Sequence, residues 1–156
     1  MPYIVFWKLF FDPKFFGLFV RTNISTKDNV HQGRYIGIIT RIAVEDGRLI
    51  GVCRLWPIIV GADKIPALFV GPVAIDPDFQ GQRLGLTVTG EALEAATKAG
   101  WGAAVIIGSP RYFSELGFTV VAPDRFQFPG PQDMSRVMVR ALAGSADELS
   151  GALRAY

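Results

Sequence analysis

The segment between residues 71 and 85 carries the residues best suited to chemistry. It reads GPVAIDPDFQGQRLG, and its last part places Gly81 and Gly85 in a turn before a helical pattern. The first backbone N–H groups of a helix lack acceptors within the helix, and the helix dipole places about half a positive charge there. Glycine lets an anion approach such amides closely, and Arg83 adds a formal charge beside them. The pattern predicts a phosphate-type anion site, although the same glycines equally suit a turn that only packs the helix.

Two common phosphate-binding motifs are absent from the sequence. The chain contains no Gly-x-Gly-x-x-Gly pattern of a dinucleotide-binding fold, and no Gly-Lys-Ser or Gly-Lys-Thr of a P-loop. The predicted anion site therefore belongs to neither of these classes.

The histidine and cysteine content excludes several kinds of catalytic centre. His31 and Cys53 are each the single residue of their type, so neither a Cys/His zinc cluster nor an internal disulfide can form. His31 lies in the polar stretch 28–33, and no Gly-x-Ser-x-Gly motif is present. We interpret His31 as a solvated loop residue, and we expect neither a hydrolase triad nor a metal site.

The composition is that of a folded domain. The chain has 156 residues, of which 50% are hydrophobic and 19% are charged. This length suits one domain over residues 1–156, since domains run about 100–200 residues. Sixteen Lys and Arg against 14 Asp and Glu leave a net charge of +2. Proteins that bind nucleic acids usually have a strongly basic surface, and a net charge this small does not indicate one. We therefore expect no nucleic-acid partner.

The first 20 residues are rich in aromatic side chains. Charges at positions 8, 12 and 14 and a proline at position 13 interrupt them. No uninterrupted apolar segment of the roughly 18–20 residues needed to span a membrane remains, and we expect no signal peptide, because its basic start and its small-residue cleavage site are missing. We expect a soluble, cytoplasmic protein without a membrane partner. Phe15, Phe16 and Phe19 must then pack in the core or against another chain, which suggests a homodimer.

Hydrophobic patterning predicts the early strands. We expect strands at residues 3–7, 36–44 and 49–57, an apolar helix or extended piece at 13–20, and a polar loop at 23–33. Asp46-Gly47 between apolar runs is a strong hairpin signal, because glycine accepts the positive φ of a tight turn. A second hairpin follows, with its turn at residues 61–64 and its returning strand at 67–75.

The spacing of apolar residues changes after residue 75. Apolar positions spaced three and four apart predict a helix over residues 84–99, with Gly100 just beyond its end. A continuous apolar run at 103–107 predicts a doubly buried strand. Helical turns at 110–116, a strand at 136–142 and a capping box of Ser145 with Glu148 that opens a terminal helix complete the chain. The fold class is therefore α/β (α+β), with antiparallel hairpins first and a right-handed strand–helix–strand crossover after them.

The segment ending in the turn resembles the acyl-CoA loop of the GNAT superfamily of N-acetyltransferases, written Gln/Arg-x-x-Gly-x-Gly/Ala. Gln80 takes its first position and Gly85 its last, whereas Arg83 replaces the middle glycine. The order of elements over residues 36–142 is also similar. Leu-Trp-Pro at 55–57 and Phe-Pro-Gly-Pro at 128–131 resemble a branch of small, mostly uncharacterised bacterial members.

The resemblance implies acetyl-CoA as co-substrate and a mainly antiparallel sheet whose parallel strands splay apart. The pantetheine arm would lie in that gap like an added strand, and Pro72, which lacks an N–H, suits locally broken pairing. The backbone assigned to the acetyl and pantetheine end is that of Val73, Ala74 and Ile75, with Ser109 as a further pantetheine contact. The pyrophosphate would be held by Gln80, Gly81, Gln82, Arg83, Leu84 and Gly85.

The implied reaction is direct attack of an amine on the thioester, with an amide stabilising the oxyanion. The family often protonates the leaving thiolate with a tyrosine, but that position here is Phe113 and Tyr112 stands beside it. Tyr112 is the candidate general acid, and the alternative is a packed aromatic. None of the nearby carboxylates, on Asp76, Glu115, Glu45 and Asp46, is a convincing base.

The N-terminal part, residues 1–35, is shorter than the strand and two helices that usually precede the first hairpin and help to build the acceptor site. Two functions follow. The first is an N-acetyltransferase acting on an amine of a small molecule or peptide, with an acceptor site completed in another way, such as by a partner chain. The second is a non-catalytic acyl-CoA-binding or interaction module with the same fold.

Overall fold

The computed structural model describes residues 30–31, 34–35 and 38–156. The strand predicted at 3–7, the apolar piece at 13–20 and the dimer surface around Phe15, Phe16 and Phe19 lie outside these residues. Strand β1 (Val30–His31) pairs with β2 (Arg34–Tyr35) in a two-stranded antiparallel sheet. The polar loop predicted over 23–33, with His31 in it, is therefore wrong at residues 30 and 31, where backbone pairing prevails over polar composition.

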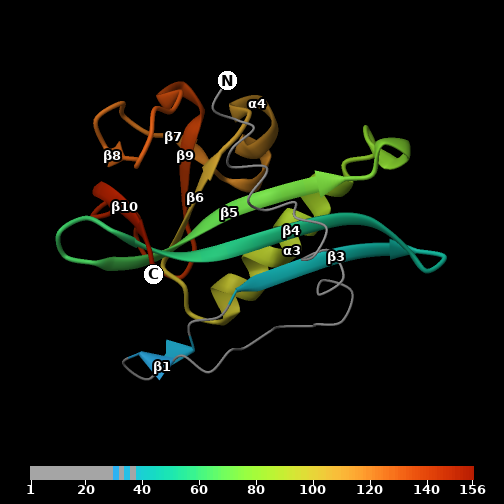
Figure 1. The fold of residues 1–156 in the computed structure, drawn as a ribbon, viewed down its shortest axis with the longest axis horizontal. Coiled ribbons are helices and arrows are strands. Elements are labelled where there is room, and N and C mark those ends of the chain that lie inside the picture. The colour runs from blue at the N-terminus through green and yellow to red at the C-terminus, as the bar shows by residue number, and fades with distance from the viewer. Residues whose placement is uncertain (1–29, 32–33, 36–37) are drawn as a thin grey trace.

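The main sheet is mixed and, within the described residues, has eight strands (Figure 1). Its strand order is β7-β9-β6-β5-β4-β10-β8, and β3 also pairs with β4. The strands are β3 (Ile39–Glu45), β4 (Arg48–Val60), β5 (Ile65–Ile75), β6 (Ala103–Ile107), β7 (Thr119–Val120), β8 (Phe126–Gln127), β9 (Val137–Ala141) and β10 (Gly151–Ala155). The mixed α+β class predicted from the sequence is confirmed.

Both predicted hairpins are present. β3 and β4 join through Asp46 and Gly47, whose φ angles are 48° and 78°. Two successive positive φ angles match the twist of the flanking strands, which is why Asp-Gly is favoured there. The longer β4–β5 hairpin turns through residues 61–64, with Gly61 and Lys64 at φ 73° and 54°.

The strand–helix–strand unit forms as predicted. Helix α3 (Leu84–Lys98) follows β5 and leads to β6, which is parallel to β5. Gly100, with φ 84°, ends the helix. Val88 and Ala92 are buried against the sheet as the periodicity indicates, whereas Ala99, assigned to the same face, is exposed because the helix has already ended.

The parallel strands β5 and β6 separate after three residues. Leu68 to Val70 pair with Ala104 to Ile106, and β5 then continues to Ile75 without further pairing to β6. This is the splay implied by the family resemblance, and it leaves one backbone edge of residues 71–75 without a partner strand among the described residues.

A bulge accompanies the splay. Val70 lies opposite Leu55 and Val73 lies opposite Cys53, so Gly71 and Pro72 together face one residue of β4. Because side chains alternate along a strand, the extra residue shifts their phase. Val73 and Ile75 consequently pack against the same core as Leu68 and Val70.

The segment after β6 forms α4 (Pro110–Phe113) and a 3-10 turn, η3 (Ser114–Leu116), and ends at Gly117 with φ 78°. This agrees with the helical turns predicted over 110–116. Two more 3-10 turns, η2 (Pro77–Phe79) and η4 (Met134–Arg136), precede α3 and β9. Within the described residues, no helix is long and apolar enough to cross a membrane.

The predicted terminal helix is wrong. Ser145 accepts a hydrogen bond from the Asp147 amide at 3.0 Å, and its hydroxyl donates to the same residue's carboxylate at 2.7 Å. Arg125 binds the carbonyls of Ala146 and Leu149, which a helix would have used itself. The chain continues as β10, which pairs with β4 and buries Leu153.

Cys53 supplies a first prediction. Its side chain is fully buried on β4, and burial raises the pKa of the thiol to about 12. Because the thiolate is the reactive form, we expect a thiol reagent at pH 8 to label the folded protein at least about 10³-fold more slowly than the unfolded chain. Labelling in denaturant provides the control, and similar rates in both states would contradict the burial.

Candidate functional site

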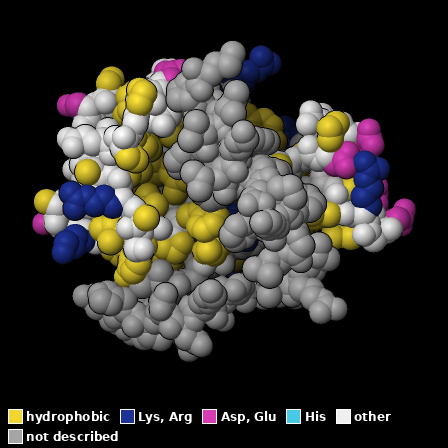
Figure 2. Space-filling view, in the orientation of Figure 1, with side chains coloured by type: hydrophobic (Ala, Val, Ile, Leu, Met, Phe, Trp, Pro, Cys, Tyr) yellow, Lys and Arg dark blue, Asp and Glu magenta, His cyan; other side chains and the backbone are white. Residues whose placement is uncertain are grey.

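The corner between β5 and α3 is fixed by one arginine and two aspartates. Arg48 lies 2.7 Å from the Asp76 carboxylate and 3.0 Å from that of Asp78, and its guanidinium lies 5.7 Å from the centre of the Phe79 ring. Asp76 also accepts a hydrogen bond from the Asp78 amide at 3.0 Å. Figure 2 shows acidic and basic side chains gathered over this turn and the neighbouring β3–β4 turn.

These contacts make Asp76 a structural residue. The bond from the Asp78 amide, together with Arg48, holds the pKa of the Asp76 carboxyl below its usual value. A carboxylate with a lowered pKa is a poorer general base.

Gln80 ties the loop to the strand. Its side-chain amide donates to the carbonyl of Ile75 at 3.1 Å. The sequence placed Gln80 among the pyrophosphate contacts, whereas in this structure its amide group holds the start of the loop against the end of β5. Its contribution to a ligand would then be positioning.

A run of unpaired amides follows Gln80. Within the described chain, the backbone N–H groups of residues 81–85 donate no hydrogen bond, whereas those of Leu86 and Thr87 bond to the carbonyl of Arg83. These amides stand at the N-terminus of α3, where the helix dipole is positive. They are the arrangement that the sequence predicted for an anion.

Arg83 takes the backbone conformation that a glycine would adopt. Its φ and ψ are 62° and 10°, in the left-handed region, and it caps α3 without a side-chain hydrogen bond to the helix. For a non-glycine residue this conformation costs about 1–2 kcal/mol. The substitution of the family's middle glycine therefore leaves the turn intact, and the Leu84 amide beyond it stays unpaired.

The Arg83 side chain reaches a residue 32 positions away. Its guanidinium forms a two-pronged ion pair with Glu115 on η3: Nη2 binds Oε2, and Nη1 lies 3.3 Å from Oε1. The hydrogen bonds from Arg83 hold the pKa of the Glu115 carboxyl below its usual value. Glu115, which the sequence offered only as an unconvincing base, is the partner of the loop arginine. No spacing in the sequence indicates this pair.

Tyr112 and Phe113 point to different places. Phe113 is buried, packs edge-on against Phe118 with ring centres 6.4 Å apart, and lies so close to Gly108 that a Cβ there would meet the ring at 2.5 Å. Tyr112 is half-buried, and its hydroxyl lies 2.6 Å from the position a Cβ at Gly85 would occupy. The family's tyrosine position is thus a core residue, and the neighbouring tyrosine faces the first turn of α3.

The remaining predicted residues lie at the same end of the sheet. Val73, Ala74 and Ile75 are half-buried along the open edge of β5, and Ser109 is exposed directly after β6. Because β5 and β6 are parallel, their carboxyl ends lie at one edge of the sheet. The fold therefore gathers the predicted pantetheine residues and the loop of free amides around one gap.

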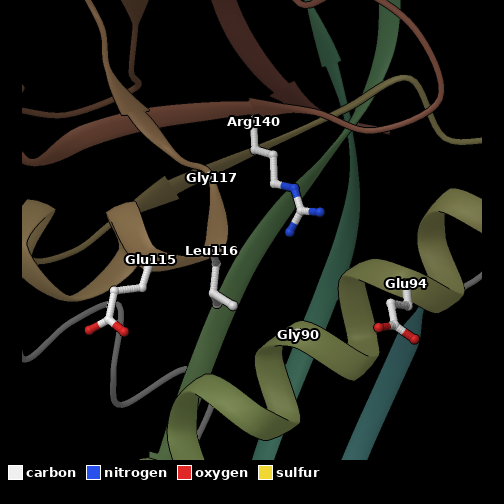
Figure 3. Close-up of a pocket in the computed structure, with 6 residues that line it drawn as sticks. All are labelled: Gly90, Glu94, Glu115, Leu116, Gly117 and Arg140. Atoms are coloured by element: carbon white, nitrogen blue, oxygen red, sulfur yellow. The ribbon is translucent and has the colours of Figure 1, made fainter.

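A shallow open depression adjoins this gap (Figure 3). It has a volume of about 420 Å³ and is lined by Gly90, Glu94, Glu115, Leu116, Gly117 and Arg140. The Arg140 side chain extends from β9 toward α3, as Figure 3 shows. Sequence reasoning did not single out Arg140, since an arginine within a short strand gives no signal of its own.

Comparison with known proteins identifies the family. Residues 5–118 match the model of the acetyltransferase (GNAT) family. The chain is 29% identical over 120 residues to the uncharacterized N-acetyltransferase YhbS of Escherichia coli strain K12, covering 75% of this chain and 72% of that protein. The chain therefore belongs to the GNAT acetyltransferase family.

Solved structures show the same fold. The Escherichia coli YhbS structure in complex with CoA aligns with a TM-score of 0.66 and 26% identity, covering 74% of this chain and 65% of that one. A GNAT acetyltransferase from Brucella melitensis in complex with acetyl-CoA aligns with a TM-score of 0.58 and 24% identity, covering 74% and 63%. This chain spans somewhat less than two thirds of the length of either structure.

The contact between Gly85 and Tyr112 supplies a second prediction. Alanine normally stabilises a helix interior by about 1 kcal/mol relative to glycine. At position 85 the added Cβ would lie 2.6 Å from the Tyr112 hydroxyl but 3.7 Å from its ring carbon Cζ. We expect Gly85→Ala to lower Tm in the native chain and to raise it in a Tyr112→Phe background. An equal effect in both backgrounds, measured by thermal unfolding, would contradict the contact.

Proposed function

We propose that this chain is an acetyl-CoA-dependent N-acetyltransferase that moves an acetyl group directly to an amine of a small molecule or peptide. The observation that carries the proposal is the run of unpaired amides at residues 81–85, placed beside the open edge of β5. Family membership supports it, as do the CoA and acetyl-CoA bound in the two aligned structures.

The loop would hold the diphosphate of acetyl-CoA. Amides at a helix N-terminus bind phosphate oxygens through hydrogen bonds and a favourable dipole. The proposed contacts are the amides of Gly81, Gln82, Arg83, Leu84 and Gly85, with Gln80 holding the loop in position. The pantetheine arm would then run along Val73, Ala74 and Ile75 as an added strand and pass Ser109.

The transfer itself needs an oxyanion donor and two proton movements. The amine nitrogen forms a bond to the thioester carbon, the carbon–sulfur bond breaks, and CoA leaves as a thiolate that must be protonated. An amide on the open edge of β5 would stabilise the carbonyl oxygen as charge develops. Tyr112 is the proposed proton donor, because its hydroxyl lies beside Gly85 in the first turn of α3.

Among the described residues, no strong carboxylate base lies near the proton that the amine releases. Asp76 and Glu115 are both bound to arginines, and these contacts favour their charged, weakly basic form. We therefore propose that the acceptor passes its proton to water.

The dimer through the apolar N-terminal region and the cytoplasmic location both stay predictions. Light scattering tests whether the protein is a dimer.

A non-catalytic acyl-CoA-binding module is the second candidate. Phe113 stands in the core where the family often has its acid, and Asp76 and Glu115 are committed to ion pairs. Acetyl-CoA binding with no thiol release across a broad panel of amines would favour this module over the enzyme.

A charge placed in the loop tests the coenzyme site. Gln82 is exposed, so Gln82→Glu adds a negative charge without steric conflict, and Gln82→Ala is the uncharged control. We expect Gln82→Glu to weaken CoA binding about tenfold, since like charges a few ångströms apart repel on that scale. Gln127→Glu on β8 controls for net charge. Calorimetry showing equal affinity for all four proteins would place the diphosphate elsewhere.

Tyr112→Phe tests the proposed acid. General acid catalysis contributes about 10²–10⁴-fold, so we expect kcat to fall by a factor in that range. The KM for acetyl-CoA should change little. If kcat is kept and KM rises, the hydroxyl contacts the coenzyme and does not protonate the thiolate.

A further inference from the structure

The ion pair between Arg83 and Glu115 joins the two sides of the proposed coenzyme site. Arg83 belongs to the loop that follows β5, and Glu115 belongs to the turns that follow β6. The two parent strands are those that splay apart. The pair therefore bridges the segments between which the coenzyme would lie.

Arg83 is the single basic residue of the loop over residues 76–87. In this structure its guanidinium is matched by the Glu115 carboxylate, and the neighbouring Arg48 is matched by Asp76 and Asp78. Among the described residues of this corner, both arginines are thus matched by carboxylates, and the unpaired donors that remain for an incoming anion are the backbone amides. Glu115 also places a negative charge next to the loop.

The pair can exchange partners. The Arg83 and Glu115 side chains are 66% and 45% exposed, so neither is locked by packing. The guanidinium can bind either a carboxylate or a phosphate through two parallel hydrogen bonds. A diphosphate on the amides of residues 81–85 would lie beside the backbone of Arg83 itself and carries more negative charge than one carboxylate.

Resting on the proposed function, we infer that Glu115 competes with the coenzyme diphosphate for Arg83 and so sets the affinity of the site. In the free protein Arg83 binds Glu115. When the coenzyme binds, the guanidinium moves to the diphosphate. The free energy needed to break the ion pair then makes the free energy of coenzyme binding less favourable. Glu115 is thus a positioning residue. It does not contact the ligand, and it lowers the affinity only because it holds Arg83 in the free protein.

The test measures CoA affinity by calorimetry for the full chain, Glu115→Gln, Arg83→Gln and the double variant. Glu91→Gln, on an exposed position of α3, is the control for loss of one negative charge. An exposed ion pair is weak, so we expect Glu115→Gln to tighten binding about two- to fivefold and Glu91→Gln to leave it nearly unchanged. Arg83→Gln should weaken binding, and in that background Glu115→Gln should give no gain.

Salt adds a second measurement. The gain from Glu115→Gln should shrink at high ionic strength, because screening already weakens the exposed pair in the native chain. Unchanged or weaker binding by Glu115→Gln would overturn the inference, as would an equal gain in the Arg83→Gln background. If none of these proteins binds CoA, the proposed function fails and the inference fails with it.

Discussion

The structure depends most on how backbone hydrogen bonds are distributed where β5 gives way to α3. The Asp76 amide is satisfied by the carbonyl of Ile50 at 2.8 Å, and the amides of Phe79 and Gln80 by the preceding turn, but the next run of amides, over residues 81–85, has no acceptor in the described chain. Unpaired amides are tolerated only where solvent or a ligand reaches them, and Gly81, Gln82 and Arg83 are exposed, whereas Leu84 is half-buried and Gly85 is buried. The surrounding ion pairs, the Gln80 contact and the left-handed turn at Arg83 all serve to hold that run in one shape. Binding chemistry at this corner is thus a property of main-chain atoms, which explains how the family's loop can tolerate an arginine in place of a glycine.

Side chains enter the site mainly from the segment after β6. Adjacent residues on a helical turn point about 100° apart, so only one of Tyr112 and Phe113 can face the loop while the other packs inward. Phe113 occupies the core position between Gly108 and Phe118, and this leaves Tyr112 against α3. Gly85 is required by the same arrangement, because the hydroxyl fills the space that a side chain there would need. Glycine in this loop therefore serves steric fit to an aromatic residue as well as access for an anion.

Local signals predicted the fold well and the side-chain partners poorly. The hairpin at Asp46-Gly47, the helix over residues 84–98 and the buried run at 103–107 each depend on a pattern within a few residues, and each is present. Ser145 and Glu148 gave a helix signal of the same kind that failed, because Arg125, 20 or more positions earlier, takes the carbonyls that a helix would use. The ion pair of Arg83 with Glu115 escaped prediction for a similar reason. Contacts between residues far apart in sequence are fixed by tertiary geometry, which local periodicity does not encode.

The two-for-one pairing at Gly71 and Pro72 has a consequence for how this domain tolerates change in chain length. The extra residue shifts the alternation of side chains by one position between the two halves of β5. Val73 and Ile75 therefore face the same core as Leu68 and Val70, although β5 has by then separated from β6. Deleting Gly71 or Pro72 would leave Val73 and Ile75 on the inner face, because the strand would then alternate regularly, but it would remove the bulge and the bend that accompanies it. Insertions at the tip of the β4–β5 hairpin, by contrast, leave this bend untouched. Natural variation in length should therefore accumulate at that tip and avoid the kinked stretch.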